Sequence, residues 1–385
     1  MRSALMAVVI STVFVAACAS GRFGPKATAK VPEGPRTLKK LTTDERRRLL
    51  QRAHVWQPIN TASLNLLVGP PVPAAQRVND DVKCTYVFPD KPLSGNTPKF
   101  RCELAPKDVV KIKYGDANAE VYSEVVGSRL LWALGFKADG MYPARVTCVG
   151  CPSDPFAASK AQWSLGKPGN VGTRVFDPAA VEREISGTPI EVPGFEGWAW
   201  PELEIVNEEA GGARRAHVDA LKLLAVFIQH SDSKPEQQEL LCAEGAKRQT
   251  ADGPETCSSP WLVVKDLGTT FGKATRLNTS KMTLADWSAA RVWKEGEPCV
   301  GDMPRSFTGS LENPRSSEGG RLFLAQRLML LGGKQIRDLF RAANVERRNE
   351  KIDAASGGSR PVTVEDWARV FERKRDEVVK ARCPA

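Results

Sequence analysis

Two aspartates, Asp232 and Asp266, stand where carboxylates can serve phosphoryl transfer. Asp232 lies in a polar loop that follows an apolar helix end, within residues 227–239, and Asp266 follows an apolar strand and precedes Gly268. In such a pair, one carboxylate orients the attacking group and the other holds a metal ion on the phosphates. The alternative is that both are solvated turn residues. The elements around them decide between these two interpretations.

A lysine-bearing strand is predicted over residues 109–114. Side chains alternate along a strand, so Lys111 and Lys113 share one face while Val110 and Ile112 share the other. Two lysines on one strand face are most often simply solvated. Before this strand, residues 85–88 and 100–104 predict a hairpin whose loop contains Gly95.

A helix is predicted over residues 120–134, with Gly135 as its C-cap. Glu120 and Glu124 lie one turn apart on it, beside an apolar face. Residues 141–148 then predict a strand, and residues 152–212, rich in Pro, Gly and Trp, are expected to be irregular. Further helices are predicted over residues 215–229, 321–331, 334–343 and 363–382.

The order of these parts resembles a protein-kinase-like fold, in its HipA-like and phosphatidylinositol-kinase-like branch. The quoted motifs are Val110-Lys-Ile-Lys-Tyr114, residues 123–136, residues 230–237 and Asp266-Leu-Gly268. The resemblance implies an α+β, two-lobed fold with a small β-rich N-lobe carrying one helix and a larger, mostly helical C-lobe. The expected divisions are residues 41–150 for the N-lobe, 151–212 for an irregular connection and 213–385 for the C-lobe.

The resemblance also implies an ATP- and magnesium-dependent phosphotransferase. Asp232 would orient the acceptor hydroxyl, and Lys234 would stabilise the transferring group. Asp266 and Gln237 would hold Mg²⁺. Lys113, or Lys111 as the second choice, would contact the nucleotide phosphates, and Glu124, preferred to Glu120, would hold the lysine. The loop residues assigned to the nucleotide are Gly95, Asn96, Thr97 and Lys99.

Two departures from the family pattern concern this site. Gln237 stands where the family has a metal-binding Asn, one methylene shorter. The loop around Gly95 has one glycine rather than three, so its grip on phosphates would rest on the Asn96 and Thr97 amides and on Lys99. Both departures put catalysis in question more than fold.

The N-terminus resembles a bacterial lipoprotein signal. Arg2 and an apolar stretch precede Val15-Ala-Ala-Cys18. We expect residues 1–17 to be removed, a lipid on Cys18, a flexible tether over residues 18–40, and a place on the periplasmic face of the outer membrane. An ordinary secretory signal is the alternative.

Eight cysteines follow Cys18, an even number that in an exported chain predicts disulfides. Proximity favours pairing Cys84 with Cys102, Cys148 with Cys151 and Cys242 with Cys257, which leaves Cys299 and Cys383. Cys148 and Cys151 are alternatively a redox pair or half of a zinc site.

Composition leaves several functions open. The net charge is +10, but the basic clusters lie in helical contexts mixed with acids and lack interleaved aromatics, so no nucleic-acid partner is expected. The acceptor, protein or small molecule, is not predicted. A pseudokinase-type binding module and a structural envelope lipoprotein are the alternatives. A serine hydrolase is disfavoured because no Gly-x-Ser-x-Gly motif occurs.

Overall fold

The computed structural model describes residues 37–72, 81–90, 92–161, 171–251, 253–277, 281–354 and 357–384. The expected signal segment, Cys18 and most of the expected tether lie outside these residues. No helix within the described ranges is long and apolar enough to span a membrane.

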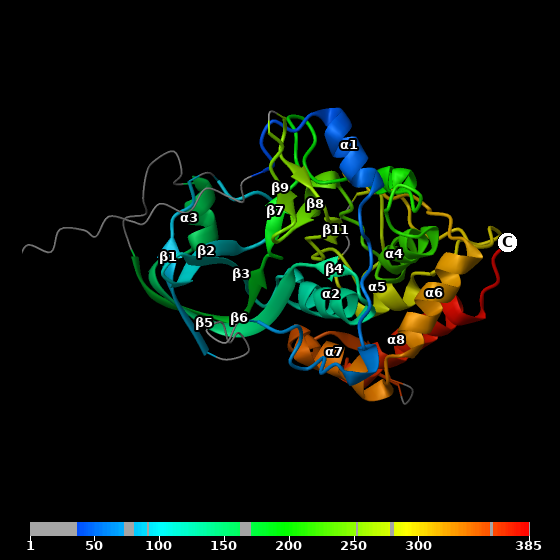
Figure 1. Ribbon diagram of the computed structural model, residues 1–385. Helices are drawn as coiled ribbons and strands as arrows, with labels where there is room; N and C mark the ends of the chain where they lie inside the picture. Colours follow the sequence, from blue (N-terminus) through cyan, green and yellow to red (C-terminus); the bar gives the residue numbers. More distant parts are fainter. Residues whose placement is uncertain are drawn as a thin grey trace, which may run out of the picture. The chain divides into compact units, whose positions relative to one another are not determined.

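The fold is mixed α/β and contains a closed barrel with the strand order β1-β2-β3-β6-β5 (Figure 1). All neighbouring strands are antiparallel except β1 and β5, which run parallel. The strands are β1 (Asp81–Val87), β2 (Lys99–Ala105), β3 (Asp108–Tyr114), β5 (Gly140–Pro152) and β6 (Val171–Arg183).

A second sheet has the order β4-β11-β8-β7, and the described residues also form two two-stranded sheets. The sheet consists of β4 (Lys137–Ala138), β11 (Pro260–Val264), β8 (Gln238–Ala243) and β7 (Gly187–Pro189). The two-stranded sheets are β9 (Lys247–Arg248) with β10 (Thr256–Cys257), and β12 (Lys351–Asp353) with β13 (Ser359–Pro361).

Eight α-helices are described, and α2 is the one that contacts the most varied set of elements. It packs against barrel strands β3, β5 and β6, against β4 of the second sheet and against α7. The helices are α1 (Thr43–Gln51), α2 (Glu120–Leu134), α3 (Pro155–Ala161), α4 (Arg215–Phe227), α5 (Leu284–Ala289), α6 (Glu318–Met329), α7 (Gly333–Ala342) and α8 (Val364–Lys380). Gly135 ends α2 in the left-handed conformation, as its sequence position predicts.

Residues 152–212 were expected to be irregular, and this expectation is wrong for a large part of the segment. Strand β6 lies here and closes the barrel between β3 and β5. Pro178 inside the strand argues against a strand at the sequence level, since proline cannot donate to a ladder. The first half of β6 also leaves apolar side chains exposed, with Val171 at 51% and Val175 at 49%. Because of these features, the sequence pattern did not indicate a strand around the buried residues 179–181.

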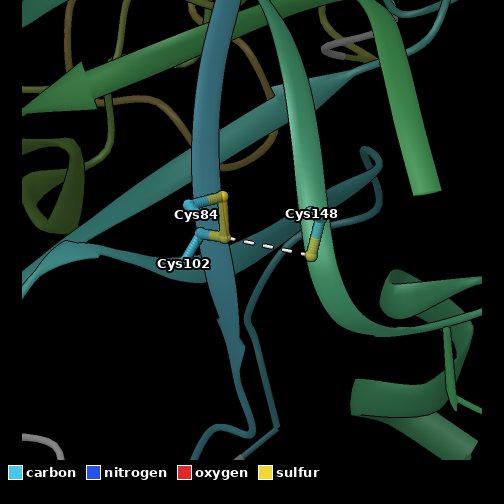
Figure 2. A group of neighbouring side chains, drawn as sticks. All are labelled: Cys84, Cys102 and Cys148. Atoms are coloured by element: carbon cyan, nitrogen blue, oxygen red, sulfur yellow. Dashed lines mark hydrogen bonds between the residues drawn. A yellow bond between two sulfur atoms is a disulfide. The ribbon is translucent and has the colours of Figure 1, made fainter. Parts of the chain in front are cut away.

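The barrel interior holds two disulfides in contact. Cys148 bonds to Cys151. Figure 2 shows the Cys84–Cys102 disulfide, with Cys102 Sγ 3.9 Å from Cys148 Sγ. The register of β5 against β6 shifts between Cys148 and Cys151. Such a bulge adds one residue to the strand, so two cysteines three apart both face the interior. A redox or zinc role is not needed to explain this pair.

The remaining two bridges are Cys242–Cys257 and Cys299–Cys383, so all four expected pairings are confirmed. Four disulfides in one chain indicate an oxidising, exported environment. The last bridge joins residues 84 positions apart, and closing so long a loop restricts the unfolded chain strongly.

Candidate active site

A buried lysine surrounded by carboxylates forms the centre of the candidate site. Lys113 Nζ lies 2.9 Å from Glu120 Oε2 and 3.8 Å from Asp266 Oδ1, and it also hydrogen-bonds Glu124 Oε1. Lys113 is only 1% exposed. The strand lysine, the helix glutamates and the Asp-Leu-Gly aspartate that the sequence singled out therefore lie together.

The strand pattern explains how Lys113 reaches this place. Val110 and Ile112 enter the barrel core, so Lys111 and Lys113 face outward from the barrel, as the alternation predicts. Lys113 is nevertheless buried, because α2 packs on that side of β3. The expectation that such lysines are most often solvated does not hold here.

Close packing of α2 against the segment after β11 brings Asp266 to the same point. Ser123 Oγ donates to the Gly268 carbonyl at 2.6 Å. A Cβ at Gly268 would lie 2.5 Å from Glu120 Cγ, so a side chain at this position would push the two segments apart. The glycine of Asp-Leu-Gly is thus required by the approach of Glu120.

Burial and charge oppose each other at these groups. Burial lowers the pKa of Lys113, but Asp266, Glu124 and Glu120 outweigh it and raise the pKa well above its usual value. Burial raises the pKa of Asp266, yet Lys113 and the hydrogen bond from the Gly268 amide hold it below the usual range. For Glu124, burial wins over Lys113, and its pKa is raised well above normal.

Lys111, the second-choice lysine, has another partner. It forms an ion pair with Glu182, which stands opposite it on β6. Lys99 stands opposite Lys113 on β2, and burial together with Lys113 lowers its pKa. The structure therefore brings Lys113, rather than Lys111, into contact with Glu124.

The loop around Gly95 contacts the same cluster through Thr97. Thr97 Oγ1 donates to Glu120 Oε2 at 2.9 Å. Gly95 has a φ of +77°, a backbone conformation that favours glycine. Asn96 is exposed. Lys99 is buried on β2 beside the loop.

Asp232 occupies the loop after α4 and both donates and accepts hydrogen bonds there. Its backbone N–H donates to Thr269 Oγ1 at 3.0 Å, and Gln237 Nε2 donates to Asp232 Oδ2 at 3.0 Å. Lys234 Nζ lies 3.4 Å from the same Oδ2 atom. The loop residues assigned from the sequence, Asp232, Lys234 and Gln237, are thus in mutual contact.

Backbone hydrogen bonds join the Asp232 loop to the Asp266 segment. The Gln237 carbonyl accepts from the Lys265 amide at 2.9 Å and from the Asp266 amide at 3.4 Å. The Ser231 amide donates to the Thr269 carbonyl at 3.1 Å. The two aspartates are therefore carried by segments that are hydrogen-bonded at both ends.

Three carboxylates of the cluster offer oxygen donors, and the Lys113 ammonium lies among them. Carboxylate oxygens of Glu120, Glu124 and Asp266 all lie within 4.8 Å of one another. Oxygen donors of this kind suit Mg²⁺. The second group of such closeness, Cys84, Cys102 and Cys148, does not offer thiolates because each sulfur is in a disulfide.

Sequence reasoning ranked Glu120 below Glu124 and missed Thr269 and Thr308. Glu120 contacts Lys113, Thr97 and Gly268 at once, and its place one turn before Glu124 was the available signal. Thr269 and Thr308 both hydrogen-bond Asp232 groups, Thr308 Oγ1 at 3.4 Å from Asp232 Oδ1. Nothing in the sequence around Thr308 marks this contact, because 76 residues separate the two.

His230 precedes Asp232 and is fully buried, which lowers its pKa to about 4. Its Nε2 lies 3.3 Å from the Gln238 side-chain amide. Between pH 6.5 and 4 the unfolded chain binds a proton here that the folded chain does not, so stability falls as pH falls. The expected slope from this group is about 1.4 kcal/mol per pH unit.

We therefore expect the free energy of unfolding of His230→Asn to fall less steeply than that of the wild type as the pH is lowered from 6.5 to 4. The measurement is the urea midpoint at several pH values for both proteins. His54→Asn, at a half-buried histidine whose pKa burial also lowers, is the comparison and should flatten the pH dependence less. Equal pH slopes for the wild type and the His230→Asn protein would contradict the assignment.

Solved structures that resemble this chain include a bacterial kinase. The crystal structure of a Helicobacter pylori proinflammatory kinase, CtkA, superposes with a TM-score of 0.38 at 9% identity, covering 76% of this chain and 91% of that chain. A likeness this slight does not place the chain in a family. No protein-family model matches the sequence, and no curated protein matches it either.

Proposed function

We propose that this chain binds ATP with Mg²⁺ and transfers the γ-phosphoryl group to a hydroxyl acceptor. The observation that carries the proposal is the buried Lys113, which pairs with Glu124 and lies close to Asp266. The segment that bears Asp266 is in turn hydrogen-bonded to the Asp232 loop. Phosphoryl transfer needs positive charge on the phosphates and a carboxylate at the acceptor. These groups supply both.

Each residue then has a definite task. Lys113, fixed by Glu124 and Glu120, contacts the α- and β-phosphates. Asp266, with Gln237, is the candidate holder of Mg²⁺, which supplies charge neutralisation on the phosphates when bound. Asp232 orients the acceptor hydroxyl and takes its proton, while Lys234 lies beside Asp232 Oδ2 and stabilises charge on the transferring group.

We also propose the two-lobed kinase-type arrangement. The barrel with α2 would be the small lobe, and α4 to α8 the large one. The contacts of α2 with barrel strands on one side and with α7 on the other support this division.

One observation favours a second candidate, a pseudokinase-type binding module. The Gln237 amide nitrogen donates to Asp232, which turns this side chain toward the acceptor carboxylate. A module of this kind would bind nucleotide and transfer nothing. The scarcity of ATP outside the cytoplasm agrees with that alternative.

Binding is tested by thermal unfolding with ATP and Mg²⁺. A ligand that binds only the native state at a hundred times its Kd stabilises it by about 2.7 kcal/mol, and we expect a rise of this order. Asp266→Asn should remove most of the rise, and Asp353→Asn, at an exposed position on β12, should not. An unchanged unfolding temperature in the wild type would exclude both nucleotide-binding candidates.

The lipid anchor is a separate part of the proposal. The segment Val15-Ala-Ala-Cys18 supports it. We expect the full chain to fractionate with membranes, and Cys18→Ser to release it to the soluble fraction. A Cys18→Ser protein that stays with membranes would contradict lipidation at Cys18.

A further inference from the structure

The turn at residues 305–311 is clamped onto the Asp232 loop from a distant part of the chain. Ser306 Oγ donates to the Ser231 carbonyl at 2.7 Å, and Ser310 Oγ donates to the Ser233 carbonyl at 2.7 Å. The Leu311 amide adds a bond to Ser233 Oγ at 3.1 Å. Bonds on both sides of the turn fix its middle over Asp232.

The middle of this turn is Thr308. Its Oγ1 donates to Asp232 Oδ1 at 3.4 Å, and the residue is otherwise on the surface. Gly309 allows the close approach, since a Cβ there would lie 2.5 Å from Ser306 Oγ and 2.7 Å from Ser233 Oγ. A threonine hydroxyl therefore occupies the position at which the candidate carboxylate would receive an acceptor.

We infer that Thr308 is the acceptor of an intramolecular phosphoryl transfer, an inference that rests on the proposed function. Thr308 Oγ1 attacks the γ-phosphorus of ATP, and the bond from that phosphorus to the β,γ-bridging oxygen breaks. The products are phosphothreonine and ADP. The hydroxyl proton passes to Asp232 and from there to solvent. ATP is the sole phosphoryl donor required.

The surroundings suit a hydroxyl that gains negative charge. Lys234 Nζ lies 3.4 Å from the other oxygen of Asp232. The Arg305 guanidinium donates to the Gly309 carbonyl at 3.1 Å, within the same turn. Lys234 and Arg305 thus place positive charges on the two segments that meet at Asp232 and Thr308.

The test is incubation of the full chain with γ-labelled ATP and Mg²⁺, followed by mapping of the labelled site by mass spectrometry. We expect label on Thr308, label on serine in Thr308→Ser, and at least a tenfold loss in Thr308→Ala. Thr250→Ala, an exposed threonine in another turn, is the matched control and should keep the label. A first-order rate constant that does not change with protein concentration marks transfer within one molecule.

A parallel assay separates this inference from the function beneath it. The wild type is given dephosphorylated casein as an added acceptor, and nucleotide binding is followed by thermal unfolding. Label on casein, or on other residues of the chain, with Thr308 unlabelled would overturn the inference and leave the proposed function standing. Nucleotide binding without any transfer would overturn transfer at Thr308 and favour the binding module. Absence of nucleotide binding would overturn both proposals.

Discussion

Lys113→Met is expected to lower the free energy of unfolding by about 3–5 kcal/mol. The substitution leaves Glu120, Glu124 and Asp266 close together without the cation that they surround. Removing one partner of a buried ion pair costs this much because the remaining charge stays buried and uncompensated. Urea denaturation at neutral pH measures the change.

Two further variants separate charge from packing in this cluster. Adding Asp266→Asn to Lys113→Met should recover a substantial part of the loss, because Asp266, whose pKa lies below its usual range, is the carboxylate that keeps its charge. Lys83→Met replaces an exposed lysine on barrel strand β1 and should change stability by less than about 0.5 kcal/mol. If Lys113→Met behaved like Lys83→Met, the carboxylates would not depend on the lysine.

Asp232→Asn is expected to slow phosphoryl transfer by about 10²–10⁴-fold, the usual contribution of a positioned general base. The amide keeps the size of the side chain and loses the ability to take the acceptor proton. Stabilisation by ATP and Mg²⁺ should persist, because Asp232 is not among the groups that contact Lys113. Single-turnover transfer of label from ATP measures the rate.

The control for this substitution is again Asp353→Asn, which should transfer label at the wild-type rate. A loss of both nucleotide stabilisation and transfer in Asp232→Asn would show that Asp232 supports binding rather than the chemical step. Transfer at the wild-type rate would remove Asp232 from the mechanism.

Local patterns predicted the elements that carry the cluster. Alternation in β3 set the shared face of Lys111 and Lys113, and the glycine at 135 set the end of α2. The disulfides followed from spacing, since close cysteines close short loops and leave one distant pair. These features depend on neighbours in sequence, which is why the sequence alone sufficed.

Features that depend on tertiary packing were not predictable in this way. Strand β6 contains Pro178 and leaves valines exposed in its first half, so its place in the barrel becomes visible only beside β3 and β5. The three contacts of Glu120 and the contact of Thr308 with Asp232 arise from approaches between distant segments. The burial of Lys113 likewise depends on where α2 packs.

The most direct measurement is the transfer of label from γ-labelled ATP by the purified full chain with Mg²⁺, compared with the double substitution Asp232→Ala plus Asp266→Ala. Label should pass to a hydroxyl of the protein or of an added acceptor in the wild type alone. Equal label in the doubly substituted chain, or none in the wild type, would contradict a phosphotransfer site built on these two aspartates.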